Sequence, residues 1–217
     1  MKNTIIAIDG EASSGKSTQA KKIADYLGYS YLDSGAFYRA ITLFFKRKEI
    51  TSATSFNKNE LDEISLNSNY NNGKNSIYLN GDDVSDDIRS VGISEIVSDF
   101  AKEKEVREHV YKHLRELSKN QSIVIDGRDI GTVVFPNADF KFFLYANPEI
   151  RAKRRFSEID KDEINYKSVL DNLKYRDITD STRDIAPLKK AHDAYSIDVS
   201  ELSIDQVFKK LMNIIEK

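Results

Sequence analysis

One segment near the start of the chain has the residue types and the spacing to hold a phosphate chain. Between Gly10 and Thr18 the sequence is Gly-Glu-Ala-Ser-Ser-Gly-Lys-Ser-Thr, so two glycines bracket four residues and a lysine and a serine follow. The glycines allow torsions that turn backbone N–H groups toward an anion, and a helix beginning there adds its dipole. The lysine would place a charge on the β- and γ-phosphates, and the serine hydroxyl is a ligand for Mg²⁺. We therefore expect a nucleoside triphosphate at Gly10, Glu11, Ala12, Ser13, Ser14, Gly15, Lys16, Ser17 and Thr18, with Ser17 as the metal ligand.

The residues around this loop predict the elements that must position it. Thr4 to Ile8 form a β-branched apolar run, and Ala20, Ile23, Ala24 and Leu27 are spaced for one face of a helix over Lys16 to Leu27. A strand, a glycine-bounded loop and a helix in this order distinguish a phosphate loop from a glycine turn with only a structural role.

Further apolar runs predict the sheet that carries this loop. They lie at Tyr29 to Leu32, Ser122 to Ile125, Phe140 to Tyr145 and Ala194 to Val199, with helical segments between them. Two helical segments have apolar stripes that we expect to face the core: Val106, Val110, Leu114 and Leu117, and Ile204, Val207, Phe208, Leu211, Ile214 and Ile215. Strands that alternate with helices indicate an α/β fold with a parallel sheet flanked by helices.

The pattern changes between residues 50 and 89, where the sequence is rich in Asn and Ser. Apolar positions at 61–66 and a strand-like run at 76–79 lie among these polar residues, with Gly73 and Gly81 as turn signals. We expect a small inserted subdomain that contains a hairpin, and a disordered linker is the alternative.

Composition limits the other classes of function. The 217 residues, 40% of them hydrophobic, suffice for one core, and the absence of cysteine excludes disulfides and thiolate metal sites. A net charge of −2 and a pI near 6.0 argue against binding of long nucleic acid. The N-terminal residues lack a signal peptide, and no apolar run approaches membrane-spanning length. We expect a cytoplasmic monomer, in which His109 and His113 lie on a solvated helix face and do not bind metal.

The arginines of the chain indicate a second anionic substrate. Lysines outnumber arginines 22 to 11, yet seven arginines fall in or beside distinctive segments: Arg39, Arg107, Arg128, Arg154, Arg155, Arg176 and Arg183. A guanidinium binds phosphate with two parallel hydrogen bonds, whereas surface ion pairs are the alternative for any one of these residues. The chain also lacks the guanine-recognition motif of a GTPase, which favours a small-molecule kinase.

Four ordered segments, together with the phosphate loop, resemble the bacterial cytidylate kinase family along essentially the whole chain. They are Leu32–Arg39 (LDSGAFYR), Gly81–Ser85 (GDDVS) with Ile88-Arg89, Asp126–Pro136 (DGRDIGTVVFP), and Arg176–Arg183 (RDITDSTR) with Ala186–Leu188 (APL). The resemblance implies a nucleoside monophosphate kinase fold with a core at 1–49, 90–150 and 190–217, a monophosphate-binding insertion at 50–89 and a helical lid at 151–189. It implies ATP as phosphoryl donor and CMP or dCMP as acceptor.

The resemblance also implies roles for single residues. Ser34, Tyr38, Arg39 and Arg128 would clamp the acceptor phosphate, and Ser98, Arg107 and Asp129 would recognise cytosine. Arg176 and Asp180 would hold the ribose hydroxyls, Arg183 would close over the transferring group, and Arg154 and Arg155 would begin the lid over ATP. The residues expected to act in catalysis are Lys16, Arg128, Arg176 and Arg183.

Two departures from the family pattern concern the lid and the phosphate loop. Thr179 and Ser181 stand where some relatives carry further lid arginines, which leaves open how many lid cations contact the phosphoryl group. Glu11 to Ser14 stand where other relatives have more glycine. We expect no functional consequence there, because these positions act mainly through their backbone N–H groups.

The expected chemistry is direct in-line transfer, in which Lys16, Mg²⁺ and arginines neutralise the equatorial oxygens. A phosphate with a second pKa of roughly 6 is already ionised and needs no general base. Asp126 either supports a Mg²⁺-bound water or braces the turn at Gly127. Asp129 either accepts from cytosine N4 or only holds Arg128 in an ion pair. A kinase for UMP, AMP or dTMP, or a nucleotide-binding module without turnover, remains the alternative function.

Overall fold

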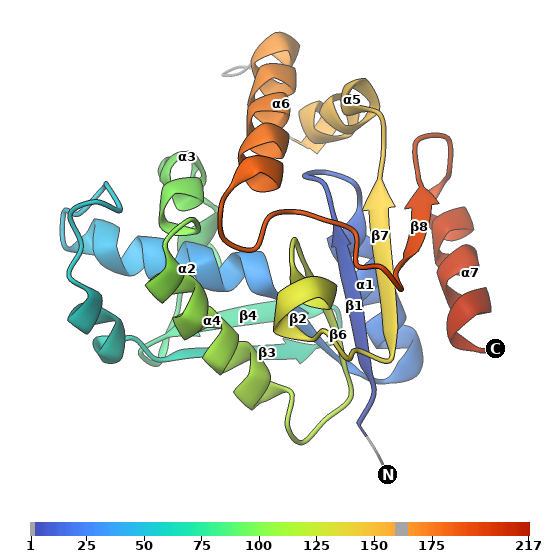
Figure 1. The fold of residues 1–217 in the computed structure, drawn as a ribbon, viewed down its shortest axis with the longest axis horizontal. Helices are drawn as coiled ribbons and strands as arrows, with labels where there is room; N and C mark the ends of the chain where they lie inside the picture. The colour runs from blue at the N-terminus through green and yellow to red at the C-terminus, as the bar shows by residue number, and fades with distance from the viewer. Residues whose placement is uncertain (1–2, 159–164) are drawn as a thin grey trace.

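A parallel sheet forms the centre of the computed structural model, which describes residues 3–158 and 165–217 (Figure 1). Within these residues the sheet has five strands in the order β2-β6-β1-β7-β8, and every adjacent pair is parallel. Their bounds are β1 Ile5–Gly10, β2 Ser30–Asp33, β6 Ile123–Gly127, β7 Phe140–Tyr145 and β8 Tyr195–Asp198. The predicted α/β class and the five predicted strands are confirmed.

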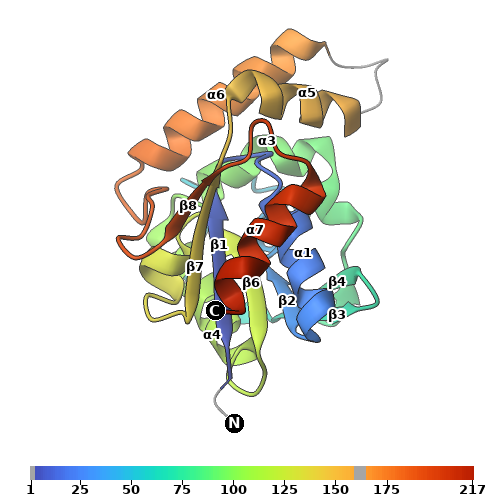
Figure 2. The ribbon, with the colours of Figure 1, turned by 90° about the vertical axis from the view of Figure 1, so that its right-hand side faces the viewer.

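Helices cover both faces of this sheet, which is why its inner strands β6, β1 and β7 are mostly apolar (Figure 2). On one face, α1 (Lys16–Leu27) and α7 (Ile204–Ile215) pack on Ile6, Ile8 and Val124. On the other, α2 (Ser34–Arg47) and α4 (Lys104–Leu117) pack on Ala7, Ile123 and Ile125, with α3 (Val91–Phe100) beside α2. Alternate residues of a strand point to opposite faces, so each of β1 and β6 contributes to both clusters.

The Asn- and Ser-rich segment is ordered and joins the second of these cores. A 3-10 helix at Lys58–Glu63 precedes β3 (Leu66–Asn71) and β4 (Lys74–Leu79), which pair antiparallel, and β5 (Asp82–Asp83) pairs with β4. Asn72 and Gly73 both have positive φ, as a two-residue hairpin turn requires. A further 3-10 helix lies at Asp87–Arg89. The predicted hairpin is confirmed, and the alternative of a disordered linker is wrong.

Two helices, α5 (Pro148–Glu158) and α6 (Tyr166–Thr182), lie beyond the edge of the sheet to which the parallel strands point (Figure 1). They pack on each other through Ala152, Val169 and Leu173. The lid expected at 151–189 contains most of both helices, and its residues 159–164 lie outside the described part of the chain. No helix among the described residues is long and apolar enough to cross a membrane.

The two neighbouring histidines do not lie on a freely solvated face. A ring nitrogen of His109 is 3.0 Å from the carbonyl oxygen of Ile64, and the rings of His109 and His113 have centroids 4.5 Å apart. Both side chains are half-buried. The predicted helix face is therefore only partly solvated, because the insertion packs against α4 and Ile64 contacts His109.

Candidate active site

The phosphate loop runs from the end of β1 into α1 and depends on both of its glycines. A Cβ atom at Gly10 would overlap the carbonyl oxygen of Leu144 on the adjacent strand β7. Gly15 has φ 83° and caps α1 in the left-handed region, which a residue with a Cβ adopts only under strain. The loop therefore leads directly into the N-terminus of a helix, which is the context that the sequence predicts.

Lys16 lies buried at the centre of this loop, where its ammonium group donates to the carbonyl oxygen of Glu11 at 2.9 Å. Burial, and then the charge of the nearby Arg128, lower the pKa of Lys16 to about 7. A buried ammonium that is surrounded by other cations gains stability when a polyanion binds beside it.

Ser17 and Asp126 face each other across α1 and β6. The Ser17 hydroxyl donates to one carboxylate oxygen of Asp126 at 2.8 Å, and the Tyr31 hydroxyl donates to the other at 2.6 Å. Burial, and then the charge of Asp33, raise the pKa of Asp126 to about 6. The side chain of Asp126 thus points to the serine of the phosphate loop, whereas its main-chain carbonyl accepts from Ser34 at 2.7 Å.

A buried carboxylate that the sequence analysis missed holds the loop after β6. Asp9 accepts from the backbone N–H groups of Ile130 and Gly131 at 2.8 and 2.7 Å, and these residues begin a π-helical turn at Ile130–Val134. Burial raises the pKa of Asp9 to about 7. Asp9 therefore connects the end of β1 with the segment that carries Arg128 and Asp129. Its position one residue before Gly10 was a sequence signal that could have identified it.

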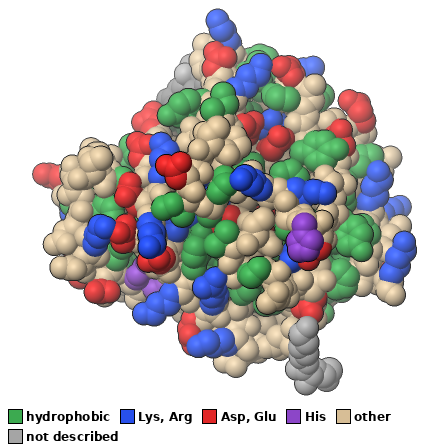
Figure 3. Space-filling view, in the orientation of Figure 1, with side chains coloured by type: hydrophobic (Ala, Val, Ile, Leu, Met, Phe, Trp, Pro, Cys, Tyr) green, Lys and Arg blue, Asp and Glu red, His purple; other side chains and the backbone are tan. Residues whose placement is uncertain are grey.

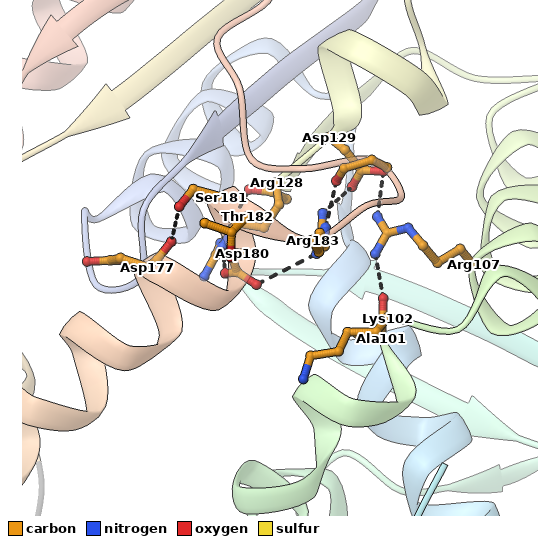
Figure 4. A network of polar contacts seen from close by, with 12 residues as sticks. Ala101, Lys102, Arg107, Arg128, Asp129, Asp177, Asp180, Ser181, Thr182 and Arg183 are labelled. Atoms are coloured by element: carbon orange, nitrogen blue, oxygen red, sulfur yellow. Dashed lines mark hydrogen bonds and ion pairs between the residues drawn. The ribbon is translucent and has the colours of Figure 1, made fainter. Parts of the chain in front are cut away.

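Asp129 forms a buried ion pair with Arg107 of α4 (Figure 4). The two side chains are 4% and 1% exposed, and Arg107 donates to Asp129 at 2.6 Å. Arg107 also donates to Tyr111 at 2.8 Å and to the carbonyl of Ala101 at 2.7 Å, and Tyr111 donates to Asp129 at 2.5 Å. The alternative in which Asp129 holds Arg128 is wrong, because the Asp129 carboxylate forms its ion pair with Arg107.

Arg128 pairs instead with Asp180 of α6, at 2.8 Å. Asp180 also lies 3.6 Å from Arg183, whose second terminal nitrogen is 3.8 Å from Asp129 (Figure 4). These long contacts leave that nitrogen buried without a hydrogen bond among the described residues. Two of the four segments that carry the resemblance, residues 126–136 and 176–183, are thus brought together at the carboxyl edge of the sheet.

Two further predicted residues, Arg176 and Arg39, add cations to the same region. Burial, then Arg128 and Arg39, lower the pKa of Arg176 to about 10. Burial also lowers the pKa of Arg39, and Arg155 and Arg128 are among the cations that lower it further. Arg39 donates to the neutral Ser94 hydroxyl at 2.8 Å. Guanidinium groups that depress one another's pKa form a site for an anion.

The other four predicted residues, Tyr38, Ser98, Arg154 and Arg155, differ in their burial and in their contacts. The Tyr38 hydroxyl is buried without a partner among the described residues, and the Tyr38 ring lies 5.2 Å from the Arg107 guanidinium. Ser98 is half-buried on α3. Arg154 donates to the carbonyls of Val199 and Ser200 at 2.7 and 3.3 Å, whereas Arg155 is 3.3 Å from Glu158.

The side chains of the phosphate loop also do more than the sequence analysis expects of them. Glu11 accepts from the backbone N–H of Ala146 at 3.2 Å, and Ala12 is buried against α5 and α6. Both contact Arg151, a buried arginine that the sequence analysis passed over although it opens the basic run at residues 151–155. The side chains of Glu11 and Ala12, for which we expect a role only through the backbone, therefore also contact the residues that position α5 and α6.

Comparison with known proteins agrees with this geometry. A family model described as cytidylate kinase matches residues 6–217. The cytidylate kinase of Fusobacterium nucleatum is 45% identical over 100% of this chain and 99% of that protein, and the one of Thermosipho melanesiensis is 44% identical over 98% and 96%. A solved shikimate kinase from Bacteroides thetaiotaomicron shares the fold, with a TM-score of 0.50 over 99% of both chains at 13% identity. With a family model and such relatives spanning nearly its whole length, the chain belongs to the cytidylate kinase family.

Proposed function

We propose that this protein transfers the γ-phosphoryl group of Mg·ATP to CMP or dCMP, giving ADP and CDP or dCDP. The observation that carries the proposal is the group of cations around the phosphate loop. Burial and then the charge of Arg128 lower the pKa values of Lys16 and Arg176, and both also lower the pKa of Arg39. Asp180 is the carboxylate that pairs with Arg128 at hydrogen-bond distance within the described residues. So many buried cations fit two phosphate-bearing ligands better than one.

The acceptor base would be recognised by Asp129. One oxygen of this carboxylate accepts hydrogen bonds from Arg107 and Tyr111, whereas the other, within the described part of the chain, has the long contact with Arg183. That second oxygen is suited to accept from the N4 amino group of cytosine, and it would oppose the O4 of uracil acceptor to acceptor. Arg107 and Ser98 would complete the site, with Arg107 also fixing the orientation of the carboxylate.

The phosphates would be held from two sides. Tyr38, Arg39, Arg128 and the loop at Ser34 would bind the acceptor phosphate, and Arg176 with Asp180 would hold the ribose. Lys16 and Arg183 would neutralise the γ-phosphoryl group during in-line transfer. We assign Arg155 to the ATP phosphates. Arg154, whose guanidinium faces Val199 and Ser200, would contact ATP from the β8 side.

The metal site would consist of hard oxygen donors, which Mg²⁺ prefers. Ser17 and Asp126 supply them within 2.8 Å of each other. Bound Mg²⁺ would supply positive charge to the β- and γ-phosphate oxygens. Asp126 is therefore assigned to the metal side of the loop rather than to the turn at Gly127.

The insertion at 50–89 and the lid at 151–189 would enclose the acceptor from opposite sides of the core. We propose that the protein is a cytoplasmic monomer without affinity for long nucleic acid. Figure 3 supports the absence of nucleic-acid affinity for the face it draws, where acidic and basic side chains are interspersed. Light scattering after size-exclusion chromatography measures the mass against 24.8 kDa for one chain.

A coupled assay of ADP release tests the proposed activity across the common ribo- and deoxyribonucleoside monophosphates. We expect CMP and dCMP to give the highest kcat/KM, and Lys16→Ala to abolish the signal without loss of the fold. Preference for UMP, AMP or dTMP, or ATP binding with no ADP release on CMP, would overturn the assignment.

A further inference from the structure

The buried guanidinium of Arg151 lies outside the sites described so far. Arg151 is 1% exposed in the first turn of α5, and its donors contact three separate segments. It donates to the carbonyls of Ala146 at 2.8 Å and Ala12 at 3.1 Å. It forms ion pairs with Glu11 at 3.2 Å and with Asp177 at 2.8 Å. A single side chain thus joins the phosphate loop, the end of β7 and the lid helix α6.

The apolar contacts around Arg151 join the same parts. Ala12 of the phosphate loop is buried in one cluster with Ala152 of α5 and with Val169 and Leu173 of α6. Leu173 and Asp177 are four residues apart, so they lie on the same face of α6, and this face is turned to the loop. The cluster and the ion pairs therefore hold the same stripe of the helix.

The other stripe of α6 carries the substrate-facing charges. Arg176 and Asp180 are also four residues apart, and each follows a member of the first pair, Leu173 or Asp177, by three residues, so the two stripes are adjacent around the helix. Asp180 is already joined to Arg128 of the core. The rotation of α6 about its axis, which Asp177 fixes, thus decides whether Arg176 and Asp180 face the acceptor.

We propose that Glu11, Arg151 and Asp177 form a clamp that positions the lid helix against the phosphate loop, so that Arg176 and Asp180 meet the substrates in the correct register. These three are positioning residues, since they act through the loop and α6 rather than on the substrates. The inference rests on the proposed function, because the register matters only if α6 faces an acceptor. It also gives the side chain of Glu11 a role at a loop position where other relatives have more glycine.

The charges of the clamp predict non-additive effects. Glu11→Gln leaves Arg151 paired with Asp177, and Asp177→Asn leaves it paired with Glu11, so each single variant keeps one carboxylate. The double variant leaves a buried guanidinium with only carbonyl partners, which such a cation tolerates poorly. We expect each single substitution to lower kcat about threefold and the double variant to lower it at least about thirtyfold, more than the product of the singles.

A matched control cuts another connection between the same two helices. Lys174 of α6 and Glu149 of α5 are 3.3 Å apart, but both side chains are about half exposed and neither contacts the phosphate loop. We expect Lys174→Gln to change kcat less than about twofold, as for exposed ion pairs generally. ATP affinity of Lys174→Gln, measured by calorimetry, should stay within about threefold of the parent, because this pair does not contact the phosphate loop.

A second measurement reports the position of α6 without any turnover. The chain contains no cysteine, so Tyr175→Cys on α6 and Tyr26→Cys on α1, both 62% exposed, accept one spin-label pair. We expect a narrow distance distribution in the parent and in Lys174→Gln, a broader one in each single clamp variant and the broadest in the double variant. This experiment distinguishes failure of the clamp from failure of the proposed activity, since it requires no acceptor.

Three results would overturn the proposal. They are wild-type kcat in the double variant, unchanged label distances in both single variants, and broadening by Lys174→Gln as large as that of the clamp substitutions. Because each single variant keeps Arg151 paired, the distance measurement decides the question even where the double variant unfolds.

Discussion

Removal of the Asp129 carboxylate is the sharpest test of the buried pair on which base recognition depends. Asp129 and Arg107 are 4% and 1% exposed and 2.6 Å apart, so neither solvent nor salt screens the pair. Removing one partner of a buried ion pair costs about 3–5 kcal/mol, because the other charge stays buried. Tyr111 and the carbonyl of Ala101 still accept from Arg107, which places the expected loss at about 3 kcal/mol.

The assay is thermal unfolding of Asp129→Ala without nucleotide. For a protein of this size, 1 kcal/mol shifts Tm by about 2–4 °C, so we expect a decrease of about 6–12 °C. The matched control is Asp87→Ala, which cuts the exposed pair between Asp87 and Arg47 at 2.9 Å and should change stability by less than about 1 kcal/mol. An equal, small shift in both variants would refute the conclusion that Arg107 depends on Asp129.

The same variant tests recognition of the base, provided that kcat/KM is measured well below its lowered Tm. Loss of the carboxylate should reduce activity on CMP by at least about one to two powers of ten and reduce activity on UMP much less. Asp129→Asn keeps an acceptor for Arg107 and should preserve stability, but its amide can also donate to uracil O4. An unchanged ratio of CMP to UMP activity in Asp129→Ala would remove Asp129 from base recognition.

Three further predictions concern the charged side chains of Lys16, Arg183 and Asp9. Because Lys16 has a pKa of about 7 without ligand, ATP binding at pH 8 should take up as much as about 0.9 proton. This uptake should appear as a binding enthalpy that depends on the buffer, and identical enthalpies in buffers of different ionisation heat would contradict it. Lys16→Ala should abolish the buffer dependence and lower kcat by several orders of magnitude. Arg183→Lys should lower kcat far more than CMP affinity, because lysine keeps the charge but loses the planar fork; the opposite pattern would assign Arg183 to ground-state binding. Burial raises the pKa of Asp9 from 3.8 to about 7, so the stability due to its protonated form is complete below pH 4 and lost as pH rises through 7. Asp9→Asn should therefore gain stability relative to wild type between pH 5 and pH 8 in urea unfolding, and a constant difference would argue against a raised pKa.

Short-range patterns in the sequence determined the fold class and the phosphate loop. A phosphate loop is built from contiguous residues, so its glycines, Lys16 and Ser17 are visible as a motif. The strands and the hairpin at Gly73 were equally visible, because periodicity and turn residues act over a few positions. Motif resemblance also identified the family, and the charged residues of the acceptor region with it.

Only the tertiary structure decided how those charges pair. Asp129 and Arg107 are 22 residues apart, Arg128 and Asp180 are 52 apart, and Arg151 reaches back to Glu11 across most of the chain. Nothing local distinguishes a partner at such separations, so the sequence left Arg128 as a candidate partner of Asp129 and gave Glu11 no side-chain role. The parallel sheet decides these pairings, because it brings the carboxyl ends of β1, β6 and β7 to one edge, where burial makes every unpaired charge costly.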